Sequence, residues 1–558
     1  MASELDRKFD AVLAAVTGPG GRIVVGADEQ GRAIVTNFPA TLPSFFNTFC
    51  MLNGAVEGVV AGEERLTFAD LDAWSDLVAT ALVGRGIAKG DRVAIAMRNC
   101  PSWIVTYMGT LKAGGVATLI NGWWQTEELA HALKLTEPKL VIADGPRAAR
   151  IEALAGDYDM LTLPIEQHLD AALAPLLDGA SADATLPEIA PEDEATILFT
   201  SGSTGEAKGA LSTHRAVTAG VYAYATSLMT MLGVLESSGT PPPNPPRTLV
   251  NVPLFHVTGE VPVLLNSFAI GRGMVLMAKW DAAEALRLIA KEKITYFVGV
   301  PTMSLELMNH PDHDKYDTST LTDLAAGGAA RPVAHVERLL EAFPNAQPAL
   351  GYGLTETNAV GCGNFWSNYA AKPASTGRAQ KPFVDIAILG AHDAHLPSGE
   401  RGEIGIRSAA NISGYWRNPE ATAAAFTADG FLKTGDIGYL DEDGYLFIVD
   451  RKKDIIIRGG ENISAAEVEA AIYACEGVSE AAVFGVPDER LGEVPIAIIH
   501  SLADHELDDE TLRAFLFARL AAYKVPAVMH FSSEPLPRLG TGKIDRVALK
   551  QQFTDLPS

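Results

Sequence analysis

Helical and extended patterns alternate along the chain from residue 66, and this alternation limits the fold more than any other feature. The segment LTFADLDAWSDLVATAL has apolar residues at helical spacing, and RVAIAM then has the continuous apolar run of a buried strand. A second apolar segment begins at Pro101, ends before the Gly114-Gly115 pair and precedes the extended runs VATLI and KLVIAD. Strands that alternate with helices predict an α/β fold around a mostly parallel sheet. The expected buried face of the first helix consists of Phe68, Leu71, Trp74, Leu77, Val78 and Leu82.

The chain is long enough for more than one domain. Its 558 residues exceed the size at which a single hydrophobic core stops growing. The pattern changes after residue 430, where FLKTGDIGYLDEDGYLFIVD alternates like a hairpin and DEDG supplies the turn, followed by the charged cluster DRKKD. We predict a large multi-layer N-terminal domain of sheets flanked by helices, residues 1–448, and a small C-terminal α/β domain, residues 449–558.

Charge and composition exclude several classes of partner. The 69 acidic and 44 basic residues give a formal net charge of −25, which repels nucleic acid and anionic membrane surfaces. The N-terminal segment is a poor signal peptide, which favours a cytoplasmic location. Asn266 and Arg272 interrupt the most apolar later stretch, VPVLLNSFAIGRGMVLMA, so we expect no membrane span. The four cysteines have no metal-binding spacing and are interpreted as reduced thiols.

The strongest local signal is ILFTSGSTGEAKG, an apolar strand that leads into a loop of glycine and hydroxyl residues. Glycines let backbone N–H groups approach phosphate oxygens, hydroxyls add donors and Lys208 adds positive charge. It is not a Walker A loop, which needs glycine and Ser or Thr where Ala207 and Gly209 stand. It is not a nucleophile elbow, which needs glycine at Ser201. A flexible loop without a ligand is the alternative for this stretch alone. The residues expected to hold phosphate are Thr200, Ser201, Gly202, Ser203, Thr204, Gly205 and Lys208.

Further motifs follow in order: VPLFHVTG, GYGLTET, STGRA, GEIGIR, GYW, FLKTGDIGYLDEDGYLFIVDRKKDIIIRGGENI, EVE and LPRLGTGKIDR. With the phosphate loop they cover about residues 60–550 and resemble the adenylate-forming (AMP-binding) superfamily, in its branch of fatty-acid and aryl-acid CoA ligases. Ala207 and Ala465 stand where proline is usual or common in that family, and neither departure removes a polar group. The resemblance implies an acyl-CoA synthetase. Such an enzyme activates a carboxylic acid with ATP as acyl-AMP, releasing pyrophosphate, and then forms acyl-CoA with release of AMP.

The resemblance also implies which residues bind the nucleotide and a metal. Glu356 is expected to bind Mg²⁺ together with Thr204, because Mg²⁺ prefers a carboxylate plus phosphate oxygens and water. Asp436 is expected to accept hydrogen bonds from both ribose hydroxyls. Taken alone, Glu356 would more often be an exposed loop carboxylate, and Asp436 would as often be a turn residue beside glycine. The other residues expected around the nucleotide are Gly328, Gly351, Tyr352, Gly353, Thr355 and Arg451.

The small domain is expected to be a mobile lid over the active site. Lys543, in RLGTGKIDR, resembles the catalytic lysine that bridges the substrate carboxylate and the ATP phosphates. The segment of Arg458, Gly459 and Gly460 resembles the turn that approaches coenzyme A once the lid has rotated, and Lys453 matches the hinge position. A solvated surface lysine, a tight turn and a plain charged linker are the respective alternatives.

The acid itself is not identified by these motifs. The expected acyl pocket contains His256, Val257, Tyr222, Gly327 and Gly353, and apolar residues after the phosphate loop hint at a fatty or aryl acid. His256 is a candidate catalytic residue, with a structural histidine as the alternative. The rival functions are transfer of the acyl group to a carrier protein, although no carrier-domain serine motif follows Lys543, and a non-catalytic nucleotide-binding regulatory protein. A homodimer remains open.

Overall fold

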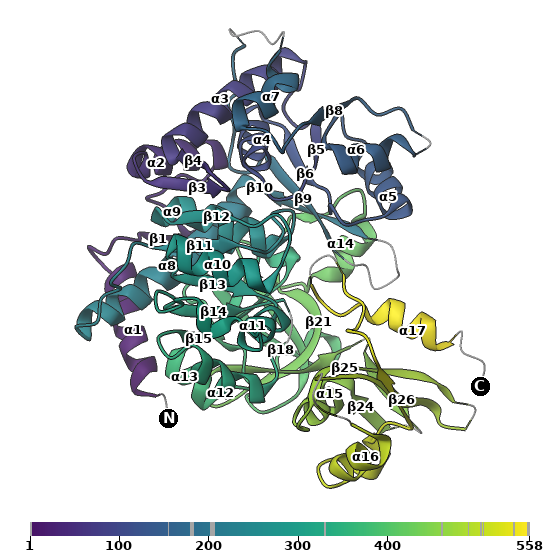
Figure 1. The fold of residues 1–558 in the computed structure, drawn as a ribbon. Helices are drawn as coiled ribbons and strands as arrows, with labels where there is room; N and C mark the ends of the chain where they lie inside the picture. The colour runs from purple at the N-terminus through teal and green to yellow at the C-terminus, as the bar shows by residue number, and fades with distance from the viewer. Residues whose placement is uncertain are drawn as a thin grey trace.

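Residues 66–144 form the alternating helices and strands that their apolar pattern predicts. Figure 1 shows the fold in the computed structural model of the chain, in which α3 spans Phe68–Gly84. The helix begins where Thr67 and Asp70 cap one another's backbone amides. The helix packs against α4 (Pro101–Lys112), every residue of which is buried. Leu77 departs from the prediction, being 52% exposed, because the buried stripe of α3 runs through Ser75 and Val78 instead.

The structure describes residues 3–154, 156–178, 184–200, 207–328, 331–452, 454–458, 461–488, 490–502, 505, 507–539 and 542–554. The first sheet is mostly parallel. At one edge β20 pairs antiparallel with β10, and β10 pairs antiparallel with β9. In spatial order its strands are β20 (Gly414–Tyr415), β10 (Lys208–Thr213), β9 (Glu194–Thr200), β6 (Val116–Leu119), β5 (Arg92–Ala96), β7 (Leu140–Asp144) and β8 (Met160–Leu163).

A second, larger sheet joins a parallel half to an antiparallel half. Strands from β3 to β15 run parallel apart from the edge strand β4, whereas pairing from β15 onward is antiparallel. In spatial order its strands are β18 (Val384–Leu389), β19 (Gly402–Ser408), β21 (Leu432–Leu440), β22 (Tyr445–Arg451), β17 (Gly377–Ala379), β16 (Gly361–Phe365), β15 (Gln347–Gly353), β14 (Asp323–Ala326), β13 (Tyr296–Gly299), β11 (Arg247–Val250), β12 (Gly273–Leu276), β3 (Glu57–Ala61) and β4 (Glu64–Thr67).

Helices cover both faces of the parallel half. On one face, Phe297 and Leu324 pack with α10 (Ala282–Glu292), α11 (Pro301–Met308) and α12 (Val333–Ala342). On the other, Val298 and Ala325 belong to the main core together with α8 (His214–Ser237), the π-helical turn η1 (Gly259–Leu265) and α9 (Asn266–Ile270). Within the described part of the chain, α8 alone has the length and apolarity to cross a membrane, but 61% of its apolar window is buried, as in a core helix.

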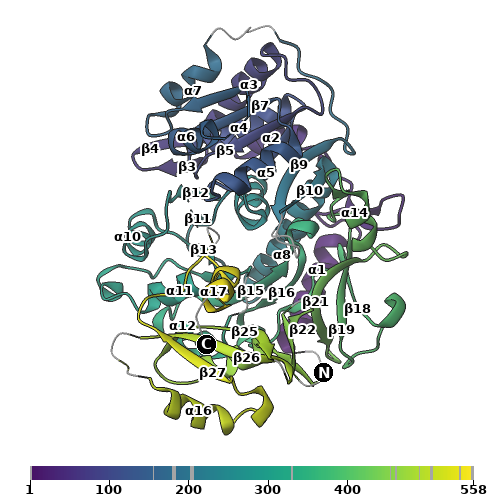
Figure 2. The same cartoon turned by 90° about the vertical axis from the view of Figure 1, so that its right-hand side faces the viewer.

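The C-terminal part has a sheet and a core of its own. β23 (Ile455–Arg458), β24 (Glu461–Ser464), β25 (Val478–Asp488), β26 (Gly492–Ser501) and β27 (Val528–Ser532) pack with α15 (Ala465–Tyr473) and α16 (Asp509–Phe517), and α17 (Arg546–Thr554) ends the described chain. Figure 2 shows this unit at one end of the molecule. The predicted α/β class with a large N-terminal and a smaller C-terminal part is confirmed. Sheet membership changes between Arg451 and Ile455, slightly after the expected boundary.

Candidate active site

A cavity of about 2300 Å³ lies where the carboxyl ends of β13, β14 and β15 meet β21 and the C-terminal unit. Ligands of open α/β sheets bind at this end of the strands. Many of the residues singled out in the sequence line the cavity, although they come from distant parts of the chain. These are Thr200, Lys208, His256, Val257, Gly327, Gly328, Gly351, Tyr352, Gly353, Thr355, Glu356, Asp436, Arg451 and Lys543.

Asp436 is held in one orientation by two partners. Strand register places it opposite Arg451 across β21 and β22, and Arg451 Nε lies 3.0 Å from Asp436 Oδ1. The Tyr352 hydroxyl donates to Asp436 Oδ2 at 2.6 Å. Burial and the nearby Asp436 charge raise the pKa of Tyr352, so the phenol remains a donor. Each carboxylate oxygen keeps further lone pairs, and the pair can therefore accept hydrogen bonds from two neighbouring hydroxyls.

Glu356 lies on the short 3₁₀ turn η3 (Thr355–Thr357) at the cavity wall. The Tyr415 hydroxyl donates to its Oε1 at 2.9 Å, and the Lys208 ammonium lies 5.0 Å from the centre of the Tyr415 ring. Burial raises the pKa of the Glu356 carboxyl, against the opposing effect of the Arg451 and Lys208 charges. The described residues contain no group of three or more potential metal-ligating side chains. A cation at Glu356 would thus need ligand phosphates and water, which is how Mg²⁺ usually binds.

Lys543 reaches the cavity from the C-terminal unit. Its side chain is so near Gly328 that a Cβ on this glycine would lie 3.2 Å from Lys543 Cε. Burial and then the Arg451 charge lower the pKa of Lys543 to about 8, with Asp436 acting in the opposite direction. In this structure the C-terminal unit therefore places the Lys543 ammonium near Arg451 and Asp436 in the cavity.

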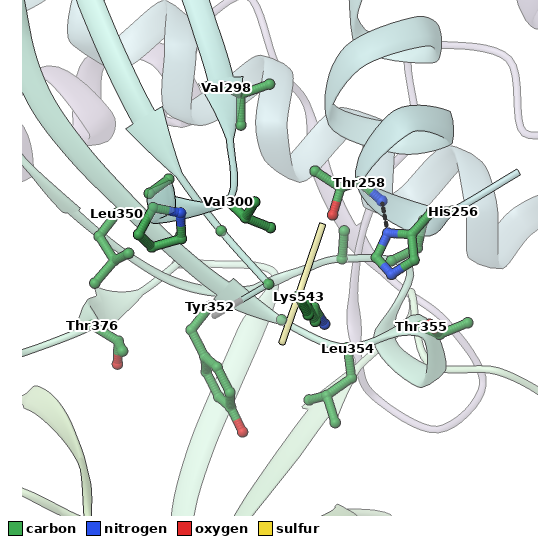
Figure 3. Close-up of a pocket in the computed structure, with 18 of the residues that line it drawn as sticks. His256, Thr258, Val298, Val300, Leu350, Tyr352, Leu354, Thr355, Thr376 and Lys543 are labelled. Atoms are coloured by element: carbon green, nitrogen blue, oxygen red, sulfur yellow. Dashed lines mark hydrogen bonds between the residues drawn. The ribbon is translucent and has the colours of Figure 1, made fainter. Parts of the chain in front are cut away.

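His256 is a neutral imidazole at the cavity wall. The Thr258 amide donates to His256 Nδ1 at 3.3 Å, so the ring hydrogen lies on Nε2 (Figure 3). Burial and the Lys543 charge lower the pKa of His256 to about 3. His256 is consequently suited to donating one hydrogen bond, whereas its low basicity makes it a poor proton acceptor at neutral pH.

Glycines form part of the cavity wall where the backbone packs tightly against another segment or where a side chain would extend into the cavity. A Cβ on Gly353 would lie 2.0 Å from the Ala359 carbonyl oxygen, whereas one on Gly351 would meet nothing within 4 Å and would project into open space. Gly328 has a φ of +75°, in the left-handed region that favours glycine. Side chains at these positions would therefore either collide with backbone, as at Gly353, or extend into the cavity, as at Gly351.

Tyr222 is a correction to the expected acyl pocket. Its hydroxyl donates to the Pro39 carbonyl at 2.6 Å, and its ring packs beside Phe38 and Phe45 in the core. The cavity is lined instead by the neighbouring Tyr224. Residues two apart on an α-helix point in nearly opposite directions, so both tyrosines could not face it.

Other expected residues lie elsewhere. Arg458 is on β23 and donates from Nη1 to the Tyr523 carbonyl at 2.7 Å, away from the cavity lining. The expected residues Ser201, Gly202, Ser203, Thr204, Gly205, Lys453, Gly459 and Gly460 lie outside the described residues.

Sequence reasoning missed several cavity residues. Tyr415, in the GYW motif, is one of them. Its hydroxyl contacts Glu356, which is 59 residues away in the sequence, and no residue spacing indicates that contact. Asn266 and Arg272 were noticed only as polar interruptions of an apolar stretch, and both line the cavity. The sequence signal for these two cavity residues is that they are polar residues within an otherwise apolar segment.

Comparisons with known proteins agree with this geometry. The model for the AMP-binding enzyme family matches residues 52–416, and that for the AMP-binding enzyme C-terminal domain matches residues 467–543. A long-chain-fatty-acid–CoA ligase of Bacillus subtilis (strain 168) is 35% identical over 524 residues, covering 88% of this chain and 91% of the relative. A feruloyl-CoA synthase of an Amycolatopsis species is 35% identical over 495 residues, covering 88% and 95%.

A solved structure titled as a Mycobacterium tuberculosis fatty acyl CoA synthetase covers 92% of this chain and 98% of its own, with a TM-score of 0.70 and 31% identity. The chain belongs to the family of AMP-binding enzymes, as the motif order predicts. Both curated relatives just described are named for forming coenzyme A thioesters.

Proposed function

We propose that the chain is an ATP-dependent carboxylic acid–coenzyme A ligase. It activates a fatty or aryl acid as acyl-AMP with release of pyrophosphate, and then forms acyl-CoA with release of AMP. The observation that carries the proposal is the meeting of Lys543, from the C-terminal unit, with Asp436 and Arg451 in one cavity. The cavity therefore contains both a cation, Lys543, and Asp436, the carboxylate proposed to bind the ribose.

In the first half-reaction a carboxylate oxygen of the acid bonds to the α-phosphorus of ATP, and the bond to pyrophosphate breaks. Both reactants are anions, so positive charge must offset their repulsion and hold them in line. Lys543 and Lys208 supply that charge. Asp436, fixed by Tyr352 and Arg451, accepts the ribose hydroxyls and sets the position of the α-phosphate.

Mg²⁺ fits the residues present. Glu356 offers a buried carboxylate with one oxygen already held by Tyr415, and Thr204 is its predicted companion. The bound ion would neutralise phosphate charge in the reaction. Because the described residues contain no group of three potential metal ligands, the site would hold Mg²⁺ mainly when nucleotide phosphates complete its coordination.

In the second half-reaction the thiol attacks the acyl carbon and the carbonyl–phosphate bond breaks, which releases AMP. Arg458, Gly459 and Gly460 are the proposed contacts of coenzyme A. Arg458 is bonded to Tyr523 outside the cavity wall in the present orientation. A rotation of the C-terminal unit about Lys453 is therefore part of the proposal, because Lys543 and the Arg458 turn serve different steps.

The wall of the cavity behind His256 supports an acid with an apolar body. Leu228, Met231, Val257, Val298 and Ala325 line it, so an alkyl chain or aromatic ring removes apolar surface from water there. The two relatives described above are named for a long-chain fatty acid and for feruloyl-CoA. A cytoplasmic location and a homodimer are proposed with the enzyme, the former supported by four buried free cysteines.

The test is a panel of fatty and aryl acids assayed for AMP formation with and without coenzyme A. The proposal predicts AMP release that needs both an acid and coenzyme A, with acyl-CoA as the second product. Release with a carrier protein in place of coenzyme A would favour the carrier-dependent rival. ATP binding without turnover for every acid would favour the regulatory protein and refute the proposal.

A further inference from the structure

The acyl cavity runs along the sheet from the reacting end to a polar inner end. Tyr296, Val298 and Val300 lie at alternate positions along β13 and its continuation, and all three line the cavity. Figure 3 shows Val300 near Lys543 and Val298 further along the same strand. Tyr296 is four residues from Val300, which corresponds to about 13 Å of extended strand. Val298 between them is apolar, whereas Tyr296, Asn266 and Arg272 line the cavity beyond it, together with Asp323, which lies opposite Tyr296 on β14 and is hydrogen-bonded to Trp366 and Thr322.

Arg272 is a charged group buried at this inner end without a counter-ion. It is 4% exposed and lines the cavity. Nε donates to Ser267 Oγ at 2.9 Å, and Nη2 donates to the carbonyls of Pro262 and Val263 at 2.8 and 3.1 Å. The guanidinium carbon lies 4.8 Å from the centre of the Tyr296 ring. All these partners are neutral, and within the described ranges no carboxylate forms an ion pair with Arg272.

Two other buried cations have ion-pair partners, whereas Arg331, which is 5% exposed and also lines the cavity, resembles Arg272 in having no ion pair within the described ranges and lies 5.8 Å from the centre of the Tyr369 ring. Arg147, also buried, is paired with Asp144 at 3.0 Å, and the buried Lys112 is paired with Asp72 at 2.6 Å. An unpaired buried charge is costly, and burial lowers the pKa of Arg272 to about 10. Nη1 of Arg272 has no hydrogen bond among the described contacts, so it is available to donate to a ligand oxygen in the cavity in place of water.

Asn266 provides a second, independent observation. It is 5% exposed, lines the same inner end, and its Oδ1 has no hydrogen-bond partner among the described atoms. Oxygen and nitrogen of an asparagine side chain are interchangeable by rotation, so Asn266 can present either a donor or an acceptor to a ligand. A purely hydrocarbon chain at this end would displace water from Arg272 Nη1 and Asn266 Oδ1 without replacing its hydrogen bonds, at a cost for each buried group.

We propose that the acid carries a hydrogen-bond-accepting oxygen, as a carbonyl or a carboxylate, at the end remote from the reacting carboxyl group, and that Arg272 binds it. The proposal rests on the proposed function and narrows its substrate class. The distance of about 13 Å along β13 sets the separation of the two polar ends of the acid. The middle of the acid is apolar, to match the Val298 and Met231 walls.

A structural role for Arg272 is the competing explanation. Arg272 donates to the carbonyls of Pro262 and Val263, which lie within the π-helical turn η1, and so stabilises this turn. A structural role predicts that substitution of Arg272 lowers stability and changes kcat/KM by the same factor for all acids. Recognition of the acid predicts instead a change in the preference among acids, whether or not stability changes.

The experiment compares sets of three acids of equal length and apolar body, one with a terminal methyl group, one with a terminal ketone and one with a terminal carboxylate. Acid-dependent pyrophosphate exchange into ATP is measured as kcat/KM for each. Wild-type protein should favour an oxygen-bearing acid over its methyl partner by at least about tenfold, as one hydrogen bond to a charged group provides. Arg272→Met should abolish that preference while it retains or improves use of the methyl acid. The ketone and carboxylate arms show which oxygen is bound.

Arg247→Met is the matched control. Arg247 begins the neighbouring strand β11, is paired with Glu57 and Glu292, and is not part of the cavity wall. It should lower thermal stability without altering acid preference. Asn266→Leu should weaken the preference in the same direction as Arg272→Met. Equal use of methyl and oxygen-bearing acids by wild-type protein, or an unchanged preference in folded Arg272→Met, would overturn the inference but leave the ligase proposal standing. Absence of exchange with every acid would instead refute the ligase itself.

Discussion

Replacing Lys543 by methionine should slow acid-dependent pyrophosphate exchange while sparing thioester formation from supplied acyl-AMP. The ammonium lies beside Gly328, Arg451 and Asp436, where the α-phosphorus is proposed to react. Loss of one donor to developing charge costs about 2.7–4 kcal/mol, equivalent to about 10²–10³-fold in kcat. A supplied adenylate no longer needs its anions brought together. Its conversion with coenzyme A should stay within about threefold of wild type, below the effect of one net hydrogen bond.

The pH dependence adds a signature that a structural lysine would not give. Burial lowers the pKa of Lys543 from 10.5 to about 8 in the ligand-free protein. Since ATP binding needs the charged form, kcat/KM for ATP should fall as pH rises through about 8, and Lys543→Arg should move that fall to higher pH.

Stability should change in the opposite sense. The unfolded chain binds the Lys543 proton more tightly than the folded chain, so stability rises as pH increases from about 8 to 10.5. The protonated lysine thus destabilises the ligand-free fold at pH 7, by on the order of 3 kcal/mol. Lys543→Met should therefore raise Tm at pH 7. Equal losses in the two half-reactions, with a flat pH profile between 7 and 9.5, would refute the role.

Four further substitutions test separate parts of the site. Glu356→Gln removes charge but keeps shape, and the Mg²⁺ concentration for half-maximal exchange should rise at least about tenfold; wild-type metal dependence would exclude this ligand. Asp436→Asn should raise KM for ATP by about tenfold with little change in Tm, and an unchanged KM would contradict ribose binding. Gly353→Ala places a Cβ 2.0 Å from the Ala359 oxygen and should lower stability by about 1–3 kcal/mol in chemical denaturation. Lys453→Pro fixes φ near −65° and should retain exchange while thioester formation falls by orders of magnitude; proportional losses would remove the residue from the hinge role.

The fold was accessible from the sequence because its signals are local. Periodic apolar residues, a capping pair at Thr67 and Asp70, and a glycine pair after α4 specify helices and strands within a few residues of each other. The family followed from ordered motifs and is confirmed by the matching family models. The order of strands in the larger sheet was not predictable, because pairing between β22 and β17 depends on contacts some 70 residues apart, as Gly377 opposite Leu446 shows.

The site was partly predictable for the same reason. The motifs identified Asp436, but nothing in them indicates that Tyr352 and Arg451 bind its two oxygens, because these contacts form only when β15, β21 and β22 assemble. The Tyr222 error came from treating an apolar helix as if all its sides faced the cavity. The proposed role of Arg272 was not predictable for a different reason: a lone arginine in an apolar segment has no motif, and its burial at the cavity wall without a counter-ion is known only from the structure.

The central claim is that the adenylate forms before the thiol takes part. Exchange of labelled pyrophosphate into ATP, measured with a productive acid and Mg²⁺ but without coenzyme A, tests it most directly. The account predicts acid-dependent exchange that needs no coenzyme A and is lost in Lys543→Met. Exchange that requires coenzyme A for every productive acid would contradict the account.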